Sequence, residues 1–259
     1  MQRSTVRRIL VLAFLLTSTA AFAFDDDCEA TAARALRVPA SGITHVVVIG
    51  KAGSLRVTGR DGAAEIRADG TACASRSSVI DDIRLVGTRV GSEYRIEAIT
   101  PEDLWWGSAS LSFEVTLPAG MAVDVRDGSG DLAIVHTGQL HVVDGSGDLE
   151  IRDVRGNVDV RDGSGDTSIR NVSGNVSITD GSGDLTIEHV GGSVTIPADG
   201  SGGAEIRDVR HDVMVEAKGS GSLEVDGVGG DLTVQRKGGG SLDYAHVSGR
   251  VNVPERWRH

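Results

Sequence analysis

The stretch from residue 127 to residue 160 reads DGSGDLAIVHTGQLHVVDGSGDLEIRDVRGNVDV and contains the pattern from which the fold follows. Its first motif recurs every 17 to 19 residues, as DGSGD at Asp127, Asp144, Asp162 and Asp180, as DGSGG at Asp199, as KGSGS at Lys218 and as KGGGS at Lys237. A second motif alternates with it, as in VRGNVDV from Val154 and VSGNVSI from Val172. A fixed period with two strand-like pieces in each unit predicts a solenoid.

The apolar residues of the repeats fall into columns. Within a strand they are two positions apart, so they share one face. The first strand supplies the column Leu132, Leu149, Thr167, Leu185, Ala204, Leu223 and Leu242, and the second strand supplies Leu140, Val158, Val176, Val194, Val213, Leu232 and Val251. Coils stacked about 4.8 Å apart would place these columns in a narrow aliphatic core that is too narrow for aromatic rings. We therefore predict an all-β fold, a parallel β-solenoid with coils of about 18 residues, and no helix in the mature chain.

The first residues are typical of a signal peptide. Arg3, Arg7 and Arg8 precede a short apolar run, and Ala21-Phe22-Ala23 matches the cleavage pattern of exported proteins. We therefore expect residues 1–23 to be removed and the mature protein to be periplasmic, secreted or displayed at the cell surface.

The mature chain divides into three further segments. Residues 24–118 are less regular and are interpreted as the first solenoid coils and a cap, with strands expected at residues 46–49, 94–99 and 111–117. Residues 119–253 are predicted to form about seven regular coils. Residues 254–259 are predicted to be a C-terminal cap or tail that covers the last strand edge, because an open edge invites aggregation.

The charge of the chain limits its partners. The formal net charge is −11, and removal of residues 1–23 takes away three arginines and brings it to −14. An acidic exterior is unfavourable for binding nucleic acid or anionic membrane surfaces. The apolar run in residues 9–16 is too short to span a bilayer, so we expect no stable membrane insertion. The expected partner is a protein or a glycan whose identity the sequence does not reveal.

Cys28 and Cys73 are the two cysteines of the chain. In an oxidising compartment they are expected to form a disulfide bond, which would stabilise the fold by about 3–4 kcal/mol. The alternative is two unpaired thiols. Neither a CxxC redox motif nor a set of zinc ligands accompanies them.

The segment VTLPAGMAVDVRDGSGDL at residues 115–132, followed by recurring G-S-G-D-L and G-x-V-x-V, resembles the putative-adhesin β-solenoid family of bacterial exported proteins. That family is similar to the head domains of autotransporter-like adhesins. The resemblance covers most of residues 45–253 and implies an exported β-solenoid with an adhesin-like role. It brings no catalytic motif with it.

The DGSGD corners are the first candidates for chemistry. Their glycines, such as Gly128 and Gly130, are expected to turn the chain with positive φ. Stacking would place two rows of aspartates side by side: Asp127, Asp144, Asp162 and Asp180 in one, and Asp131, Asp148, Asp166 and Asp184 in the other. A calcium ion would relieve the repulsion within these rows. Because the spacing differs from that of calcium-binding nonapeptide repeats, we expect instead that the aspartates face water and cap turn N–H groups, with no cofactor.

Trp105 and Trp106 are the most unusual local feature. Adjacent tryptophans in a loop are candidates for a partner contact, and the alternative is packing against a solenoid edge. The outward faces of the repeats carry neither an aromatic ladder nor a basic stripe, so we expect them to be solvated. His189 and His246 fall in one corner column but lie three coils apart, too far for one metal ion.

The sequence favours a non-catalytic protein. We predict an exported, adhesin-like interaction or structural scaffold at the cell envelope, and the alternative is a periplasmic accessory protein that binds an envelope partner. A carbohydrate-active β-helix enzyme is less favoured, because such enzymes build a cleft from long loops and the coils here are uniformly short. The serines have no histidine partner at a fitting register, so nucleophilic catalysis is not supported.

Overall fold

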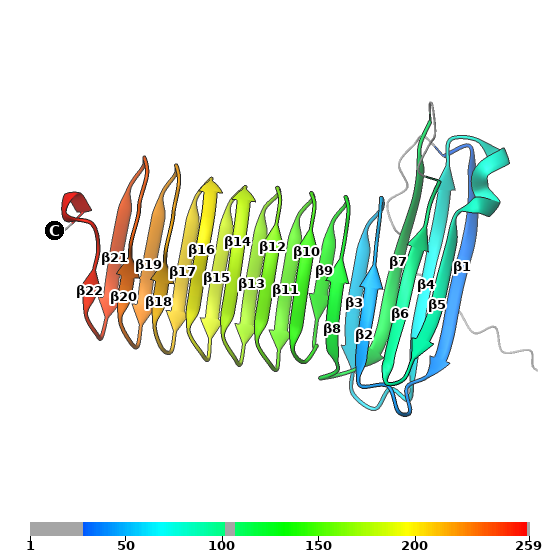
Figure 1. The fold of residues 1–259 in the computed structure, drawn as a ribbon, viewed down its shortest axis with the longest axis horizontal. Helices are drawn as coiled ribbons and strands as arrows, with labels where there is room; N and C mark the ends of the chain where they lie inside the picture. The colour runs from blue at the N-terminus through cyan, green and yellow to red at the C-terminus, as the bar shows by residue number, and fades with distance from the viewer. Residues whose placement is uncertain (1–27, 102–106, 258–259) are drawn as a thin grey trace, which may run out of the picture.

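The computed structural model describes residues 28–101 and 107–257, and the signal peptide predicted at residues 1–23 lies outside them. The described part of the chain is nearly all β-structure, with 61% of its residues in strands and 4% in helices. Two 11-stranded sheets, here called sheet A and sheet B, run side by side along a rod (Figure 1). Stacked parallel coils of about 19 residues form about seven turns of a β-solenoid, which confirms the predicted fold class.

Each regular coil contributes one strand to each sheet. Sheet B receives β8 (Ala122–Arg126), β10 (Leu140–Asp144), β12 (Val158–Asp162), β14 (Val176–Ser182), β16 (Val194–Ser201), β18 (Val213–Val215), β20 (Leu232–Val234) and β22 (Val251–Asn252). Sheet A receives β9 (Leu132–Val135), β11 (Leu149–Val154), β13 (Thr167–Val172), β15 (Leu185–Val190), β17 (Ala204–Val209), β19 (Leu223–Val228) and β21 (Leu242–Val247). Each of these strands pairs in parallel with its copy in the next coil.

The apolar columns stack as predicted. Parallel pairing aligns Leu132 with Leu149, then with Thr167, and continues to Leu242 at the far end of sheet A. These side chains are buried between the sheets in one continuous core of valine, isoleucine and leucine. In the second-strand column, the last predicted member, Val251, is instead 38% exposed at the C-terminal end of the rod. Burial of each such side chain contributes about 1.5–3 kcal/mol of gross stabilisation, which makes the columns the main source of stability.

Two kinds of corner connect the strands. At the DGSGD corner the second glycine has positive φ, as at Gly130 with φ 120°. Gly128 does not have positive φ, contrary to expectation. It is needed for space, because a Cβ there would lie 2.7 Å from the Lys51 carbonyl oxygen of the neighbouring coil. At the opposite corner, Gly227 has positive φ in one coil, and non-glycine residues have it in the others: His136, Asp153, Asn171, His189, Asp208 and His246.

Spatial order departs from chain order near the N-terminus. β2 (His45–Ile49) and β3 (Leu55–Arg60) form a coil that β8 and β9 extend in parallel. β6 (Glu93–Ile99) and β7 (Ala109–Pro118) come later in the chain but stack on the other side of this coil, also in parallel. The chain therefore adds a coil at its outer end before it returns to continue the solenoid at β8.

Antiparallel strands close this end of the rod. In sheet A, β4 (Glu65–Ala74) pairs antiparallel with β7 and with the edge strand β1 (Ala30–Pro39). In sheet B, β5 (Arg84–Val90) pairs antiparallel with β6. The expectation of no helix is wrong here, because the 3-10 helix η1 (Ser77–Asp82) lies between β4 and β5. Arg34 on β1 donates hydrogen bonds to backbone carbonyls of this connection. We call β1, β4, β5 and η1 the cap.

The exclusion of aromatic rings from the core is also wrong at two positions. Tyr94 on β6 is 7% exposed and Phe113 on β7 is 1% exposed, and both lie within the core. The pairing partner of Phe113 on β4 is Gly70, where a Cβ would lie 2.5 Å from the Phe113 Cβ. The ring is therefore accommodated because the neighbouring strand supplies no side chain at that place.

A short segment covers the C-terminal end. The second 3-10 helix η2 (Glu255–Trp257) follows β22, and Val253 before it is buried. Arg256 donates hydrogen bonds to the carbonyl oxygens of Lys237 and Gly238, which ties the segment to the last corner of the repeat. Across residues 28–101 and 107–257, no helix has the length and apolar character needed to cross a membrane.

Candidate functional site

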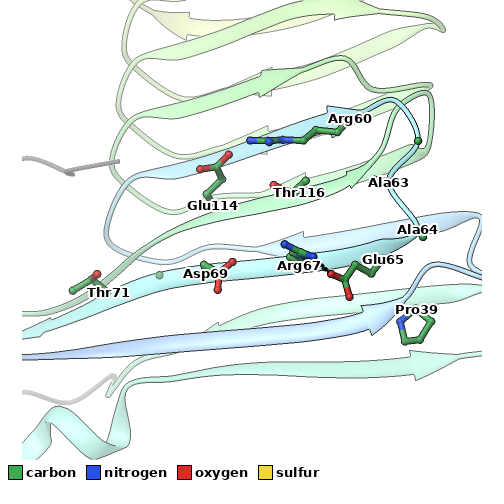
Figure 2. Close-up of a pocket in the computed structure, with 12 residues that line it drawn as sticks. Pro39, Arg60, Ala63, Ala64, Glu65, Arg67, Asp69, Thr71, Glu114 and Thr116 are labelled. Carbon is green, nitrogen blue, oxygen red and sulfur yellow. Dashed lines mark hydrogen bonds and ion pairs between the residues drawn. The ribbon is translucent and has the colours of Figure 1, made fainter. Parts of the chain in front are cut away.

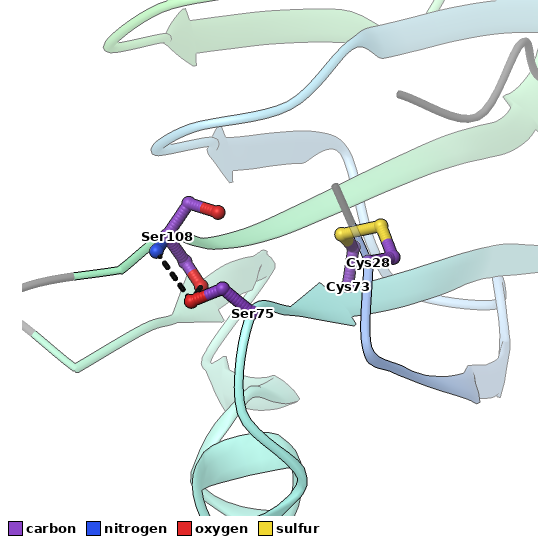
Figure 3. The surroundings of a disulfide bond; sticks show 4 residues. All are labelled: Cys28, Cys73, Ser75 and Ser108. Carbon is purple, nitrogen blue, oxygen red and sulfur yellow. Dashed lines mark hydrogen bonds between the residues drawn. A yellow bond between two sulfur atoms is a disulfide. The ribbon is translucent and has the colours of Figure 1, made fainter. Parts of the chain in front are cut away.

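The predicted disulfide bond is present. Cys28 and Cys73 are bonded with their Cα atoms 5.4 Å apart, and the bond ties the start of the described chain to β4 (Figure 3). It encloses the whole of β1 and most of β4, so it fastens the edge of the cap. The cap is thus the covalently secured end of the rod.

The predicted contact at Trp105 and Trp106 lies outside the described residues, which omit 102–106. Where the described chain resumes after residue 106, Ser108 is hydrogen-bonded to Ser75. The Ser108 backbone N–H donates to Ser75 Oγ at 2.8 Å, and this hydroxyl donates in turn to the Ser108 carbonyl oxygen (Figure 3). β4 and β7 are therefore fastened to each other where β7 begins.

The outward faces of the regular coils carry short polar side chains in rows, with a shallow hollow of about 470 Å³ beside Glu150, Ser168 and Thr186. On sheet A the row is Ala133, Glu150, Ser168, Thr186, Glu205, Glu224 and Asp243, and neighbouring coils are linked by ion pairs such as Arg170 Nε to Glu188 Oε2 at 2.9 Å. Most of these side chains are partly or fully exposed. Exposed ion pairs contribute little to stability, so these rows serve mainly as a polar surface.

A hollow interrupts the outer face of sheet A where the cap meets the solenoid. Its volume is about 840 Å³, and it is lined by Pro39, Arg60, Gly62, Ala63, Ala64, Glu65, Arg67, Asp69, Gly70, Thr71, Glu114 and Thr116. Figure 2 shows Arg60 on β3 pointing toward Glu114 on β7, while Arg67 bonds to Glu65 on β4. Asp69 and Glu114 are direct partners in the β4–β7 pairing. The lining is polar and carries both signs of charge.

The first aspartate of each DGSGD corner points into the solenoid. Asp127, Asp144, Asp162, Asp180 and Asp199 form one row with 3–7% of each residue exposed, which we call the buried aspartate row. The expectation that these aspartates face water is therefore wrong. Asp144 is the last residue of β10 and lies on the same side of that strand as the buried Leu140 and Val142. The alternation of the strand carries the carboxyl group inward.

Few hydrogen bonds satisfy the buried aspartate row. Asp144 Oδ1 accepts the backbone N–H of Gly145 at 2.9 Å, and Asp162 Oδ2 accepts the hydroxyl of Thr167 at 3.0 Å. Both carboxyl oxygens of Asp127 and of Asp180 are buried without a hydrogen-bond partner. At the start of the row, Asp127 fills the space beside Gly50, where a Cβ would lie 2.0 Å from Asp127 Oδ1.

Burial and mutual repulsion change the acidity of this row. Burial, followed by the nearby charge of Asp144, raises the pKa of Asp127 to about 7. The same two causes, with Asp162 as the neighbour, raise the pKa of Asp144 to about 6. Burial and the charges of Asp199 and Asp162 raise the pKa of Asp180 to about 7. Burial also raises the pKa of Asp162, although its bond from Thr167 opposes the shift.

Lysines continue the row in the last two coils. Lys218 Nζ lies 3.0 Å from Asp199 Oδ1, and Lys237 follows in the next coil, itself 3% exposed. Burial, together with the charges of Lys218 and Arg256, lowers the pKa of Lys237. Sequence reasoning found the change from aspartate to lysine but missed that both side chains lie inside.

The second aspartate of each corner faces solvent. Asp131, Asp148, Asp166 and Asp184 are exposed, and each accepts the backbone N–H of the next coil, as in Gly203 N–H to Asp184 Oδ1 at 2.7 Å. These bonds are the turn chemistry expected for this row. The two rows thus lie on different sides of the corner. Within residues 28–101 and 107–257, no three histidine, cysteine or acidic side chains gather as metal ligands.

Three histidines at the opposite corner lie beside aspartates of adjacent coils, which sequence reasoning missed. His136 Nε2 lies 3.4 Å from Asp153 Oδ2, and His189 Nε2 lies 3.4 Å from Asp208 Oδ2. His189 and His246 are three coils apart, as predicted, but each pairs with a carboxylate of an adjacent coil. The signal that identifies this corner is the residue type, since His, Asp and Asn tolerate the positive φ it requires.

The sequence profile of the Toastrack DUF4097 family matches residues 104–259, more than half of the chain. The chain belongs to the Toastrack DUF4097 family. The Toastrack match begins just before β7 and includes every coil from β8 to β22, so the buried aspartate row lies within it. The resemblance to adhesin-like β-solenoid proteins inferred from residues 115–132 is thereby confirmed.

Two crystal structures resemble the Toastrack chain at low identity. A putative cell adhesion protein from Clostridium sporogenes is 13% identical, with a TM-score of 0.37 over 86% of this chain and 98% of its own. A putative adhesin from Parabacteroides merdae is 11% identical, with a TM-score of 0.38 over 82% of this chain and 96% of its own. No functionally curated protein matches the chain in sequence.

Proposed function

We propose that this Toastrack chain is an exported, non-catalytic interaction scaffold of the cell envelope, adhesin-like in architecture, which binds a partner at its capped end. The hollow where the cap meets the solenoid carries the proposal, because it offers a concave surface of about 840 Å³, against about 470 Å³ for the hollow on the regular coils. Its lining comes mainly from the paired strands β3, β4 and β7. A surface held by paired strands loses little conformational freedom when it binds, which favours affinity.

The lining favours a polar partner with positive charge. The lining holds three carboxylates, Glu65, Asp69 and Glu114, and two guanidinium groups, Arg60 and Arg67. Arg67 is paired with Glu65, and Arg60 points toward Glu114. Asp69 and Glu114 lie directly opposite each other, and among the described residues neither forms an ion pair. Like charges placed opposite each other repel, so a positively charged side chain of a partner would be attracted. Among the described residues, no aromatic ring lines the hollow, which is unfavourable for stacking on sugars. A protein partner therefore fits better than a glycan.

The chemistry of the described residues supports binding rather than catalysis. Throughout residues 28–101 and 107–257, no serine hydroxyl forms a hydrogen bond with a histidine, so a base to activate a nucleophile is missing there. The perturbed carboxyl groups of the repeat are enclosed in the solenoid rather than exposed in a cleft. Substrate could not reach them without opening the coils.

Export is supported by the disulfide bond. Cys28–Cys73 encloses a loop with a sequence separation of 45 and stabilises the fold only in an oxidising compartment. Its first cysteine lies five residues after the predicted cleavage site at Ala23. The periplasmic accessory protein remains the second candidate function, because a disulfide forms equally well in the periplasm.

Protease accessibility on cells separates these two functions. The tagged chain is treated with protease on intact cells and on cells with a permeabilised outer envelope. Degradation on intact cells is the outcome expected for a surface scaffold. Protection until permeabilisation would place the chain in the periplasm and contradict a role at the cell surface. Insensitivity even after permeabilisation of the outer envelope would contradict export altogether.

The binding surface is tested by site-specific crosslinking in the same cells. A photoactivatable residue replaces Thr116 in the hollow or, as matched control, Thr195 on the outward face of β16 in sheet B. Both positions are partly exposed outward threonines. We expect a discrete adduct from Thr116 and none from Thr195. Equal adducts from both positions, or an adduct from Thr195 alone, would contradict the assignment of the hollow.

A further inference from the structure

The buried aspartate row has no role in the proposed partner contact. Burying its carboxyl groups is nevertheless the feature of the repeats that costs the most free energy. Five carboxyl groups follow one another at a single corner, one in each coil from Asp127 to Asp199. An unpaired carboxylate in an apolar interior costs far more free energy than one buried aliphatic side chain returns. The negative charges of the row must therefore be neutralised.

We propose that neighbouring carboxyl groups of the buried aspartate row share protons at neutral pH, so that the Toastrack solenoid is a pH-sensitive element whose coils lose stability when the row ionises. In such a pair, the protonated carboxyl donates its O–H to an oxygen of the ionised neighbour. The proton comes from water when the chain folds and returns to water when the pH rises. No other reactant is needed.

The hydrogen-bond accounting of the row supports shared protons. Asp162 and Asp180 are direct partners in the β12–β14 pairing, and each carboxyl group shifts the pKa of the other. Two carboxylates cannot bond, because each offers only acceptors, whereas a carboxyl and a carboxylate can. Sharing a proton would give partners to the oxygens of Asp127 and Asp180, which otherwise have none. Buried polar groups are almost always hydrogen-bonded, so this accounting favours protonation.

The C-terminal coils show the alternative means of neutralisation. Lys218 brings its ammonium group to Asp199, and the carbonyl oxygens of Gly202 and Ser220 accept its other hydrogen bonds. From Asp127 to Asp180, no residue of the described chain places a cation in this position. Neither hollow on the surface of sheet A is lined by a member of the row. A proton needs no such space, whereas a calcium ion needs six to eight oxygen ligands.

The charged groups that act on the row are few. They are its own five members together with Lys218 and Lys237, which lie beyond Asp199 along the same corner. Facing the row at its other end is Gly50, which has no side chain. The hydroxyl of Thr167 is a further polar neighbour and bonds to Asp162. The ionisation of Asp127, Asp144 and Asp180 is therefore set by burial and by neighbouring carboxyl groups of the row, and for Asp180 it is opposed by the charge of Lys218.

The sign of the pH dependence follows from these shifts. The pKa values of Asp127, Asp144 and Asp180 rise from 3.8 to about 7, 6 and 7 on folding. Between pH 4 and pH 7 the folded chain thus holds protons that the unfolded chain has already released. Stability is greatest at the acidic side of this window and falls as the pH rises through it. Ordinary paired aspartates show the opposite trend.

Urea unfolding of the disulfide-bonded mature chain between pH 5 and pH 8, with a chelator present, tests the proposal. For each proton that only the folded state holds, the unfolding equilibrium constant rises by about tenfold per pH unit. The double variant Asp144→Asn and Asp180→Asn is expected to lose most of this slope, since asparagine resembles a neutral carboxyl. The matched control, Asp148→Asn and Asp184→Asn, changes the second aspartate of the same corners and is expected to keep the slope.

Infrared spectroscopy of the unmodified chain gives a readout that survives if the variants do not fold. At pH 6 exposed carboxyl groups are ionised, so a carboxylic-acid C=O band must come from buried groups. We expect this band at pH 6 and its loss by pH 8.5. A flat unfolding profile without the band would overturn the proposal. The alternative is that calcium or sodium neutralises the row. If either cation restored stability at pH 8 in the unmodified chain but not in the Asp144→Asn and Asp180→Asn variant, the shared-proton proposal would be overturned in favour of a bound metal cation.

Discussion

Lys218 Nζ lies 3.0 Å from Asp199 Oδ1 inside the solenoid, and both side chains are only 1% exposed. The two residues occupy the same corner in consecutive coils, and a parallel bridge joins their backbones. This pair is the point at which the buried row changes from acidic to basic. Because both charges are removed from water, loss of one leaves the other without compensation.

Replacement of the lysine should therefore be costly. Lys218→Met is expected to lower the free energy of unfolding by about 3–5 kcal/mol at pH 8, because Asp199 stays buried without its ammonium partner. The loss should be smaller at pH 5, where Asp199 can take up a proton. Urea unfolding at both pH values measures this. The double variant Asp199→Leu and Lys218→Met removes both charges and should recover most of the loss; a double variant as unstable as the single one would contradict the account.

Gly147 is expected to tolerate no side chain. It has φ 125°, and a Cβ there would lie 2.2 Å from the Gly130 carbonyl oxygen of the preceding coil. Gly147→Ala should lower the unfolding free energy by about 2–4 kcal/mol through backbone strain and overpacking. Gly239→Ala is the control, because open space surrounds its Cβ position, and should change stability by less than about 0.5 kcal/mol. Equal effects of the two substitutions in thermal unfolding would count against the close stacking of corners.

Thr167 is expected to matter for its hydroxyl rather than its volume. It occupies a column otherwise filled by leucine and alanine, and its hydroxyl donates to Asp162. Thr167→Val should cost about 1–3 kcal/mol, because it leaves a buried acceptor without its donor. This bond lowers the pKa of Asp162, so its loss should cost more at pH 8 than at pH 5. The outward Thr186→Val serves as control. A stabilising effect of Thr167→Val at both pH values would show that the hydrogen bond contributes nothing.

The disulfide bond is expected to stabilise the cap. Replacement of Cys28 and Cys73 by serine should lower the unfolding free energy by about 4 kcal/mol, according to the entropy of a loop of this length. The loss should be local, since the bond fastens β1 to β4 at the far end from the C-terminal coils. Hydrogen exchange followed by mass spectrometry measures it by region. Faster exchange in residues 30–39 with unchanged exchange in residues 204–247 is the predicted pattern, and uniform acceleration would contradict it.

The regular coils could be predicted from the sequence because each coil repeats the same pattern of apolar residues. Columns such as Leu132, Leu149 and Leu185 repeat the same choice in every coil, so both the strands and their register follow from the period. The inward direction of Asp144 had a signal as well, since it is two residues beyond Val142 in an alternating strand. Aspartate next to glycine is also typical of exposed turns, so the local motif predicts a carboxyl group that faces water and accepts turn N–H groups.

The capped end could not be predicted from the same signal. β6 and β7 alternate like any other strands, and alternation does not reveal whether a strand pairs with its predecessor or stacks outside it. The hollow depends on this crossover, because it lies where β4 and β7 meet β3. Its lining residues are separated in the chain by tens of positions, and no local pattern brings them together.

The claim that the chain acts outside the cytoplasm is tested most directly by the intact mass of the protein isolated from its own cells. We predict a chain that begins at Phe24 and whose mass corresponds to Cys28 and Cys73 joined in a disulfide bond. A chain that retains residues 1–23 and two free thiols would contradict it and leave the exported scaffold without support.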